Sequence, residues 1–119
     1  MSRIRAIIVV TGLITAIVHL VILNIGIIEE KGQPDLLFTL NGLGYLALLA
    51  AYFWKTPVLE RRRGLVRWAF IAFTAITILA WVAVGAREGI RPYLTKLDEV
   101  VLIVALWMDG RAAKQVDAA

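Results

Sequence analysis

Hydrophobic residues fill most of this chain in long stretches that short polar segments separate. The stretches 6–28, 36–54 and 68–86 contain no lysine, arginine, aspartate or glutamate, and His19 is the single histidine in the chain. At a rise of about 1.5 Å per residue, helices of this length cover the roughly 30 Å of a bilayer's hydrocarbon. The pattern therefore predicts three membrane-spanning helices.

A fourth apolar segment, 94–113, has an uninterrupted hydrophobic core only between Val100 and Met108. Thr95 followed three residues later by Asp98 resembles a capping box and predicts that a helix begins there. From Asp98 to Asp109 such a helix measures about 16 Å, which is shorter than the hydrocarbon thickness. At least one of the two carboxylates must then lie below the membrane surface, where it needs a partner or must face other helices.

The segment could instead span half the membrane or lie in the interface. We favour a full crossing, because three crossings would place Arg111 and Lys114 on the outer side. With four crossings, nine of the 13 basic residues fall on one side of the membrane: Arg3, Arg5, Lys55, Arg61, Arg62, Arg63, Arg67, Arg111 and Lys114. The positive-inside rule then predicts that both termini and the 55–67 connection are cytoplasmic.

These patterns predict an all-α fold: an integral membrane four-helix bundle with short loops. The expected helices are 6–28, 36–54, 66–86 and 95–112, within a single transmembrane domain covering 1–119. The first apolar run follows a basic start but is too long for a secretory signal, so we read it as a retained helix. We expect a multi-pass protein of the plasma or inner membrane.

Composition supports this class, with 61% hydrophobic and 18% charged residues. The net charge of +4 raises the question of nucleic acid. Because the basic residues flank apolar spans, we assign them to the membrane surface and expect no nucleic-acid partner. We interpret Arg61, Arg62, Arg63 and Arg67 as topology anchors that meet lipid head groups. The chain has no cysteine, which excludes disulfides and thiol chemistry.

Small and polar residues recur at helical spacing in each predicted span, and such stripes face neighbouring helices because lipid offers polar groups no partner. By depth, His19, Asn41 and Tyr45 fall in the same outer half as Asp98 and Glu99. We hypothesise that His19, Asn41, Tyr45 and either Asp98 or Glu99 form one polar cluster that holds a ligand or ion. Asn24 and Glu29 are expected near its mouth. A histidine beside a carboxylate can relay protons, but for a lone histidine in a bundle we favour a hydrogen bond between helices.

Two ion pairs follow from spacing and depth. Lys96 lies three residues before Glu99, which allows an intrahelical pair, and Asp109 is expected to meet Arg111, Arg3, Arg5 or Arg67. Cofactor and metal sites are not predicted, since one histidine without cysteine cannot supply the usual ligand sets. Hydrolase nucleophile motifs are absent, and Ser2 is the single serine.

Three function classes remain open. The first is a non-catalytic bundle that packs as an accessory subunit with itself or with larger membrane partners. The second is a small oligomeric transporter or channel for ions, protons or small molecules that uses the outer polar cluster. The third, which we rank last, is a lipid-handling enzyme or quinone site with His19 and a carboxylate as acid and base.

Overall fold

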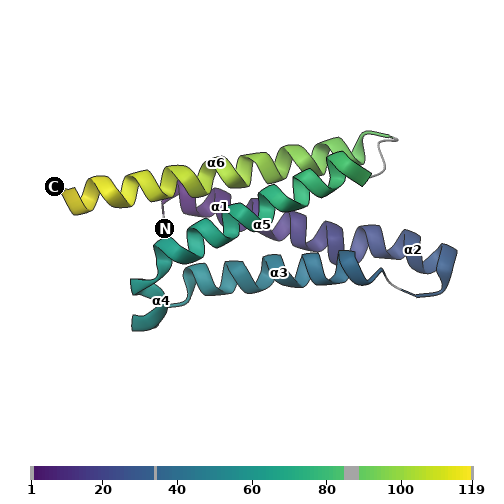
Figure 1. Ribbon diagram of the computed structural model, residues 1–119, viewed down its shortest axis with the longest axis horizontal. Coiled ribbons are helices and arrows are strands. Elements are labelled where there is room, and N and C mark those ends of the chain that lie inside the picture. Colours follow the sequence, from purple (N-terminus) through teal and green to yellow (C-terminus); the bar gives the residue numbers. More distant parts are fainter. Residues whose placement is uncertain (1, 34, 85–88, 119) are drawn as a thin grey trace.

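Four long helical rods lie side by side in the computed structural model, which describes residues 2–33, 35–84 and 89–118 (Figure 1). The described residues form helices and no strands, as the sequence predicts, and the molecule measures 55 × 26 × 23 Å. In chain order the elements are α1 (Arg3–Ile17), the π-helix η1 (Val18–Ile22), α2 (Leu23–Lys31), α3 (Leu36–Phe53), α4 (Pro57–Arg61), α5 (Arg63–Val84) and α6 (Arg91–Ala118).

The first rod is longer than predicted, because α1, η1 and α2 form one continuous helix over Arg3–Lys31. Its start is capped by the Ser2 hydroxyl, which accepts a hydrogen bond from the Arg5 amide, so the helix begins before the apolar run. It ends at Gly32, whose φ of 76° is left-handed and stops the helix. In α3 the predicted boundaries hold to within one residue, and Asp35 caps its first turn.

The helix predicted over 66–86 begins earlier than expected. Thr56 caps the short helix α4 within the basic connection, and α5 already begins at Arg63, with Gly64 in its first turn. The last described residue of α5 is Val84, so the predicted end at residue 86 lies outside the described residues. The apolar stretch therefore predicted where α5 lies, but the helix also includes the polar residues that precede this stretch.

The boundaries predicted for the last helix, 95–112, are also wrong. The helix begins at Arg91, so Thr95 lies within it and the proposed capping box does not mark its start. Pro92 stands in the first turn, where a missing backbone N–H costs nothing. The helix then runs to Ala118, past the end of the apolar core, because its last turns contain good helix formers such as alanine and lysine.

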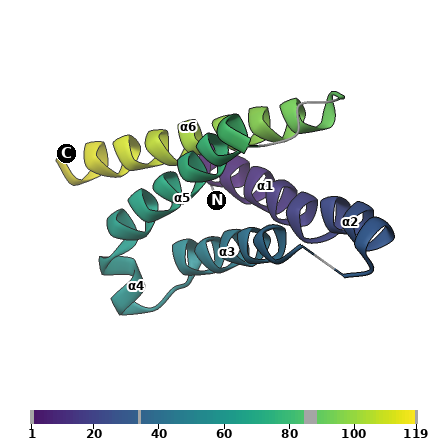
Figure 2. The same ribbon diagram turned by 45° about the vertical axis from the view of Figure 1, so that its right-hand side comes forward.

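Three helices are long and apolar enough to cross a membrane among the residues that the structure describes: Arg3–Lys31, Leu36–Phe53 and Arg63–Ala83. These indicate a membrane protein. The helix α6 is outside this set because charged residues flank its short apolar core. It packs along α1 and α5, whereas α3 packs against α1 and α5 from the other side (Figures 1 and 2).

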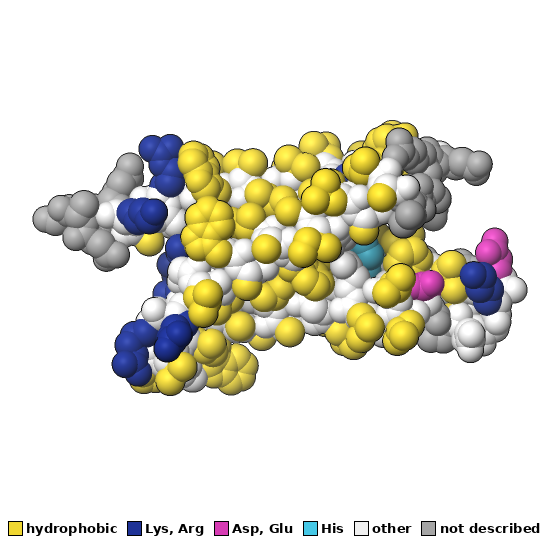
Figure 3. Space-filling view, viewed as in Figure 1, with side chains coloured by type: hydrophobic (Ala, Val, Ile, Leu, Met, Phe, Trp, Pro, Cys, Tyr) yellow, Lys and Arg dark blue, Asp and Glu magenta, His cyan; other side chains and the backbone are white. Residues whose placement is uncertain are grey.

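The rods enclose a core to which every one of them contributes. Its fully buried large side chains include Ile8, Tyr45, Phe70 and Leu102, from four different helices. Hydrophobic side chains also cover much of the outer surface, whereas lysine and arginine gather at the end where α6 finishes and α4 lies (Figure 3). The acidic side chains visible on that face lie at the opposite end.

Candidate functional site

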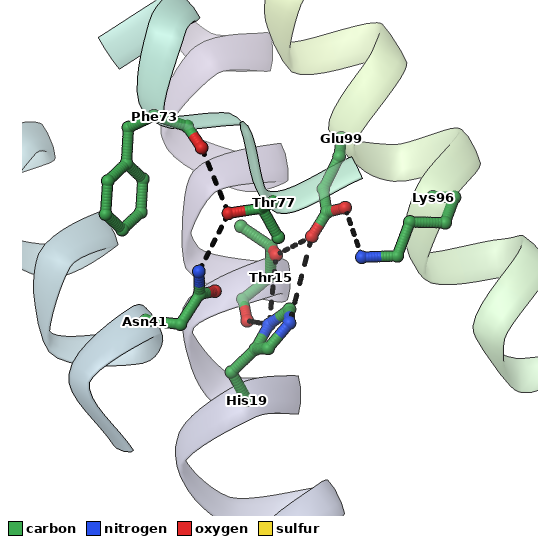
Figure 4. A network of polar contacts seen from close by, with 7 residues as sticks. All are labelled: Thr15, His19, Asn41, Phe73, Thr77, Lys96 and Glu99. Atoms are coloured by element: carbon green, nitrogen blue, oxygen red, sulfur yellow. Dashed lines mark hydrogen bonds and ion pairs between the residues drawn. The ribbon is translucent and has the colours of Figure 1, made fainter. Parts of the chain in front are cut away.

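A fully buried carboxylate, Glu99 of α6, is the centre of the polar contacts inside the bundle (Figure 4). Lys96 Nζ lies 2.7 Å from Glu99 Oε1, so the predicted intrahelical ion pair is present. On the other side, the Thr15 hydroxyl of α1 donates a hydrogen bond of 2.8 Å to Glu99 Oε2. We call Thr15, His19, Lys96 and Glu99 the Glu99 cluster.

His19 completes the Glu99 cluster from the π-helical turn η1, one helical turn beyond Thr15. Its Nδ1 lies 2.8 Å from the Thr15 carbonyl oxygen, which only accepts, so we assign the ring hydrogen to Nδ1. The other nitrogen, Nε2, then faces Glu99 Oε2 at 4.0 Å. This gap is too long for a hydrogen bond, and a proton could pass only if the groups approach or a water bridges them.

The sequence left the choice between Asp98 and Glu99 open, and the structure turns Glu99 toward His19. Asp98 is half-buried on the adjacent position of α6, and its Oδ2 has no hydrogen-bond partner within the described part of the chain. Neighbouring residues of a helix point about 100° apart, so α6 can direct only one of the two carboxylates at α1. From their place in the sequence, Arg87 or Arg91 could reach Asp98 from the adjacent connection, but Arg87 and the side chain of Arg91 lie outside the described residues.

Asn41 of α3 lies nearby but bonds elsewhere. Its Nδ2 donates a 2.8 Å hydrogen bond to the Thr77 hydroxyl of α5, which in turn donates to the Phe73 carbonyl. The Asn41 Oδ1 atom is buried and has no partner in the described structure. Asn41 therefore ties α3 to α5, and its hydrogen bond goes to Thr77 and not to His19.

Tyr45 is fully buried beside His19, with ring centroids 6.2 Å apart. Its hydroxyl lies near those of Thr15, Thr74 and Thr77 but makes no hydrogen bond of good geometry within the described residues. A buried hydroxyl without a partner is costly, and more so in a span where bulk water is absent. Tyr45 thus adds an unsatisfied polar atom between the Glu99 cluster and the Asn41–Thr77 pair.

The expected mouth residues separate in the structure. Asn24 is buried and closes the turn between α2 and α3, since its side chain donates to Thr39 and accepts from the Asp35 amide. Glu29 is exposed on α2. Asn24 therefore acts as a local connector in the structure, while Glu29 is free to meet solvent or head groups.

A second polar group lies toward the basic end. Asp109 of α6 is paired with Arg5 at 3.3 Å, lies 4.0 Å from Arg67, and accepts a hydrogen bond from the Tyr52 hydroxyl. Two of the four predicted arginine partners are therefore present, whereas the Arg111 guanidinium lies 5.0 Å from the Trp107 ring centroid instead. We call Arg5, Tyr52, Arg67 and Asp109 the Asp109 cluster.

The four predicted head-group anchors differ in their surroundings. Arg61 and Arg62 are exposed, whereas Arg63 donates to the Tyr52 carbonyl at 3.0 Å and so satisfies the end of α3. Arg67 is turned inward, with its Nε donating to the Tyr52 hydroxyl at 3.1 Å. Two anchors are therefore available at the surface, and two are occupied in joining helices.

Sequence reasoning did not identify Thr15 as the residue that binds the buried carboxylate, nor Tyr52 as a partner of Asp109. The spacing of four residues between Thr15 and His19 placed them on one face, and this was the one available signal for Thr15. Tyr52 lies near the end of a predicted span, where an aromatic residue suits the membrane interface, and nothing in the sequence shows which helix opposes it.

Among the described residues, no three histidine, aspartate or glutamate side chains come together where they could hold a metal ion. The side chains around Glu99 offer ion pairing, hydrogen bonding and a titratable imidazole. In comparisons with known proteins, no family model, curated protein or solved structure matches the chain.

Proposed function

We propose that the chain is a small four-span membrane protein that acts as a non-catalytic packing subunit and assembles with itself or with larger membrane partners. The observation that carries this proposal is the buried apolar core, to which each rod contributes a side chain such as Ile8, Leu49, Phe70 or Leu102. Along each rod, this residue lies in sequence between a member of the Asp109 cluster and a polar residue nearer the other end. An apolar core between the two polar clusters supports a structural role.

The inward orientation of two carboxylates of α6 supports a fourth crossing. Glu99 and Asp109 are buried, while Val100, Val104 and Met108 are exposed and provide an apolar face for lipid. Lys96 and Arg5 neutralise the two buried carboxylates, which lowers the cost of placing α6 in hydrocarbon. With α6 across the membrane, the basic end carrying both termini would be cytoplasmic by the positive-inside rule.

Cysteine labelling tests this placement directly, because the chain contains no native cysteine. Single cysteines at Ser2, Gln33, Arg62 and Gln115 would be probed with a membrane-impermeant maleimide in intact cells and in inverted vesicles. We expect label from outside at Gln33 only, and from the cytoplasmic side at the other three. Labelling of Gln115 from the same side as Gln33 would refute the fourth crossing.

Extraction in a mild detergent tests the packing role. The large exposed side chains on every long helix supply area for contacts between helices in lipid. We expect the extracted protein to migrate as a defined oligomer or together with a larger membrane protein, identified by mass spectrometry after cross-linking in the membrane. A monomer with no cross-linked neighbour in native membranes would contradict the proposal.

A second candidate, movement of protons or cations, is favoured by one observation. His19 Nε2 faces Glu99, and the buried Tyr45 hydroxyl and Asn41 Oδ1 next to this pair lack partners in the described structure. Proton and cation flux would be measured in liposomes that contain the purified protein alone. Flux that Glu99→Gln abolishes would favour transport, whereas no flux above that of empty liposomes supports the packing role.

A further inference from the structure

A small groove opens between α5 and α6 at the basic end of the molecule, with a cavity volume of about 40 Å³. Its walls include two tryptophans and three cationic side chains, together with a glycine: Arg67, Trp68, Trp107, Gly110, Arg111 and Lys114. We call this the α5–α6 groove. It shares no residue with the Glu99 cluster.

Gly110 explains how the two helices come close enough to form this groove. A Cβ atom placed on Gly110 would lie 2.9 Å from Arg67 Cδ, so the stem of the arginine fills the space that a side chain would need. Trp107, Arg111 and Lys114 follow at intervals of four and three residues and share one face of α6. The guanidinium of Arg111 lies over the Trp107 ring, which holds the charge at the rim of the groove.

The groove has an excess of positive charge. No carboxylate lines it among the described residues, and Asp109 lies behind Arg67 in the Asp109 cluster. Arg111 and Lys114 are exposed, whereas the side chain of Arg67 is only 11% exposed. An anion that approaches from outside therefore meets Arg111 and Lys114 first, with the charge of Arg67 partly offset by Asp109.

The tryptophans indicate which anion fits. Trp68 and Trp107 are 58% and 47% exposed, and indole rings at the ends of spans prefer the level of the lipid head groups. Cationic side chains beside them then stand at the depth of the lipid phosphates, where anionic lipids attract lysine and arginine. A soluble phosphate ion has no apolar part that could pack on the ring faces, whereas the glycerol and upper acyl chain of a lipid can.

We propose that the α5–α6 groove binds the phosphate of an anionic phospholipid through Arg111 and Lys114, with Trp68 and Trp107 packing against its glycerol and acyl chains. This inference rests on the part of the proposed function that places the basic end at a membrane surface. It assigns a defined site for one lipid, beyond a general attraction of the basic end to anionic membranes.

The test uses the full chain, with Trp54→Phe and Trp81→Phe, in vesicles that contain a small fraction of brominated phosphatidylglycerol or of brominated phosphatidylcholine. Bromine quenches nearby indoles, and in this background the signal comes from Trp68 and Trp107. We expect phosphatidylglycerol to be about tenfold or more enriched over phosphatidylcholine at these tryptophans.

The double variant Arg111→Gln with Lys114→Gln should remove that preference. The matched control is the double variant Arg61→Gln with Arg62→Gln, which removes the same charge from the exposed end of α4 and should keep the preference.

Equal loss of preference in both double variants would overturn the site, because it would show only diffuse attraction. Loss of preference on adding inorganic phosphate, at ionic strength matched with chloride, would overturn the choice of a lipid and show a site for free phosphate. Both leaflets of the vesicles have the same composition, so the orientation of the chain does not affect the result. If the tryptophan variants fail to fold, native mass spectrometry decides the same question. It compares how much phosphatidylglycerol stays bound to the chain with its native tryptophans and to the same chain with Arg111→Gln and Lys114→Gln.

Discussion

The hydroxyl of Thr15 donates a hydrogen bond of 2.8 Å to the buried carboxylate of Glu99, joining α1 to α6 across 84 positions of sequence. This contact and the Lys96 pair satisfy both carboxylate oxygens. The charge of Glu99 is thus held at a fixed depth in the bundle. The stability of the packing between α1 and α6 should therefore depend on the Glu99 carboxylate.

Removal of Glu99 should be among the most destabilising single changes. We expect Glu99→Ala to lower the free energy of unfolding by about 3 kcal/mol or more, because Lys96 loses its partner at a mostly buried position. Thr15→Val should cost about 1 kcal/mol, a typical value for one hydrogen bond between helices in a membrane. Unfolding in detergent micelles measures both, and Glu29→Ala on the exposed side of α2 serves as a carboxylate control with little expected change.

The two single changes are coupled, which a double-mutant cycle can check. In the Glu99→Ala background, Thr15→Val should cost much less, since its acceptor is already gone. If the costs of the two changes simply add, Thr15 and Glu99 do not interact in the folded protein.

The Asp109 cluster should hold the basic end of the bundle together. We expect Asp109→Leu to destabilise the fold by about 3 kcal/mol, because Arg5 and Arg67 are left facing each other without a carboxylate. Tyr52→Phe should cost about 1 kcal/mol for the lost hydrogen bonds to Asp109 and from Arg67. Thermal unfolding compared with Glu60→Gln, an exposed carboxylate on α4, gives the measurement. Equal effects of Asp109→Leu and Glu60→Gln would contradict the buried cluster.

Two glycines should respond to alanine for different reasons. A Cβ on Gly42 would lie 3.0 Å from the Ala16 carbonyl oxygen, so Gly42→Ala must push α3 away from α1 and should cost about 1 to 3 kcal/mol. Gly32 has open space around it but a φ of 76°, so Gly32→Ala should cost about 1 kcal/mol through backbone strain. Gly64→Ala, in the first turn of α5, is the matched control and should be neutral or slightly stabilising. Unfolding measurements that rank Gly64→Ala with Gly42→Ala would disprove the tight contact.

The turn between α2 and α3 should depend on Asn24. Its amide nitrogen donates to the Leu20 carbonyl and the Thr39 hydroxyl, and its oxygen accepts from the Asp35 amide. We expect Asn24→Leu to cost about 1 to 3 kcal/mol and to speed hydrogen exchange at the Asp35 and Phe38 amides. Gln33→Ala in the same turn is exposed and should leave both exchange rates unchanged. Unchanged exchange in Asn24→Leu would show that the turn is held by other contacts.

Contacts between residues close in sequence, and the pairing of one buried carboxylate, were predictable from the sequence. The Lys96–Glu99 pair follows from a spacing of three residues on one helix, and the Asp35 cap follows from its place before an apolar run. For Asp109, which lies far from its partners in sequence, four arginines were predicted as possible partners, and Arg5 and Arg67 are the two that the structure places beside it. That prediction rested on the need of a carboxylate at that depth for a cation and on basic residues that share its side of the membrane. Depth and charge sign were sufficient for these inferences.

The identity of the carboxylate that meets His19 was not predictable, nor were the ends of the last helix. Asp98 and Glu99 differ by about 100° around α6, and only the rotation of that helix against α1 decides which of them is buried. The start of α6 at Arg91 was missed because a polar first turn resembles a loop when only hydrophobicity is considered.

By itself, the sequence determined that the chain is helical and that at least three of its segments suit a membrane, because uninterrupted apolar length is a property of each segment alone. It also determined that the buried charges would need partners, since lipid supplies none. Only the tertiary structure decided that Thr15 binds Glu99, that Tyr52 binds Asp109, and that apolar side chains from all four rods pack into one core. These contacts join helices that are far apart in sequence. They depend on how each helix is rotated and how closely it approaches its neighbours, and the packing of the whole bundle sets the rotation and the spacing.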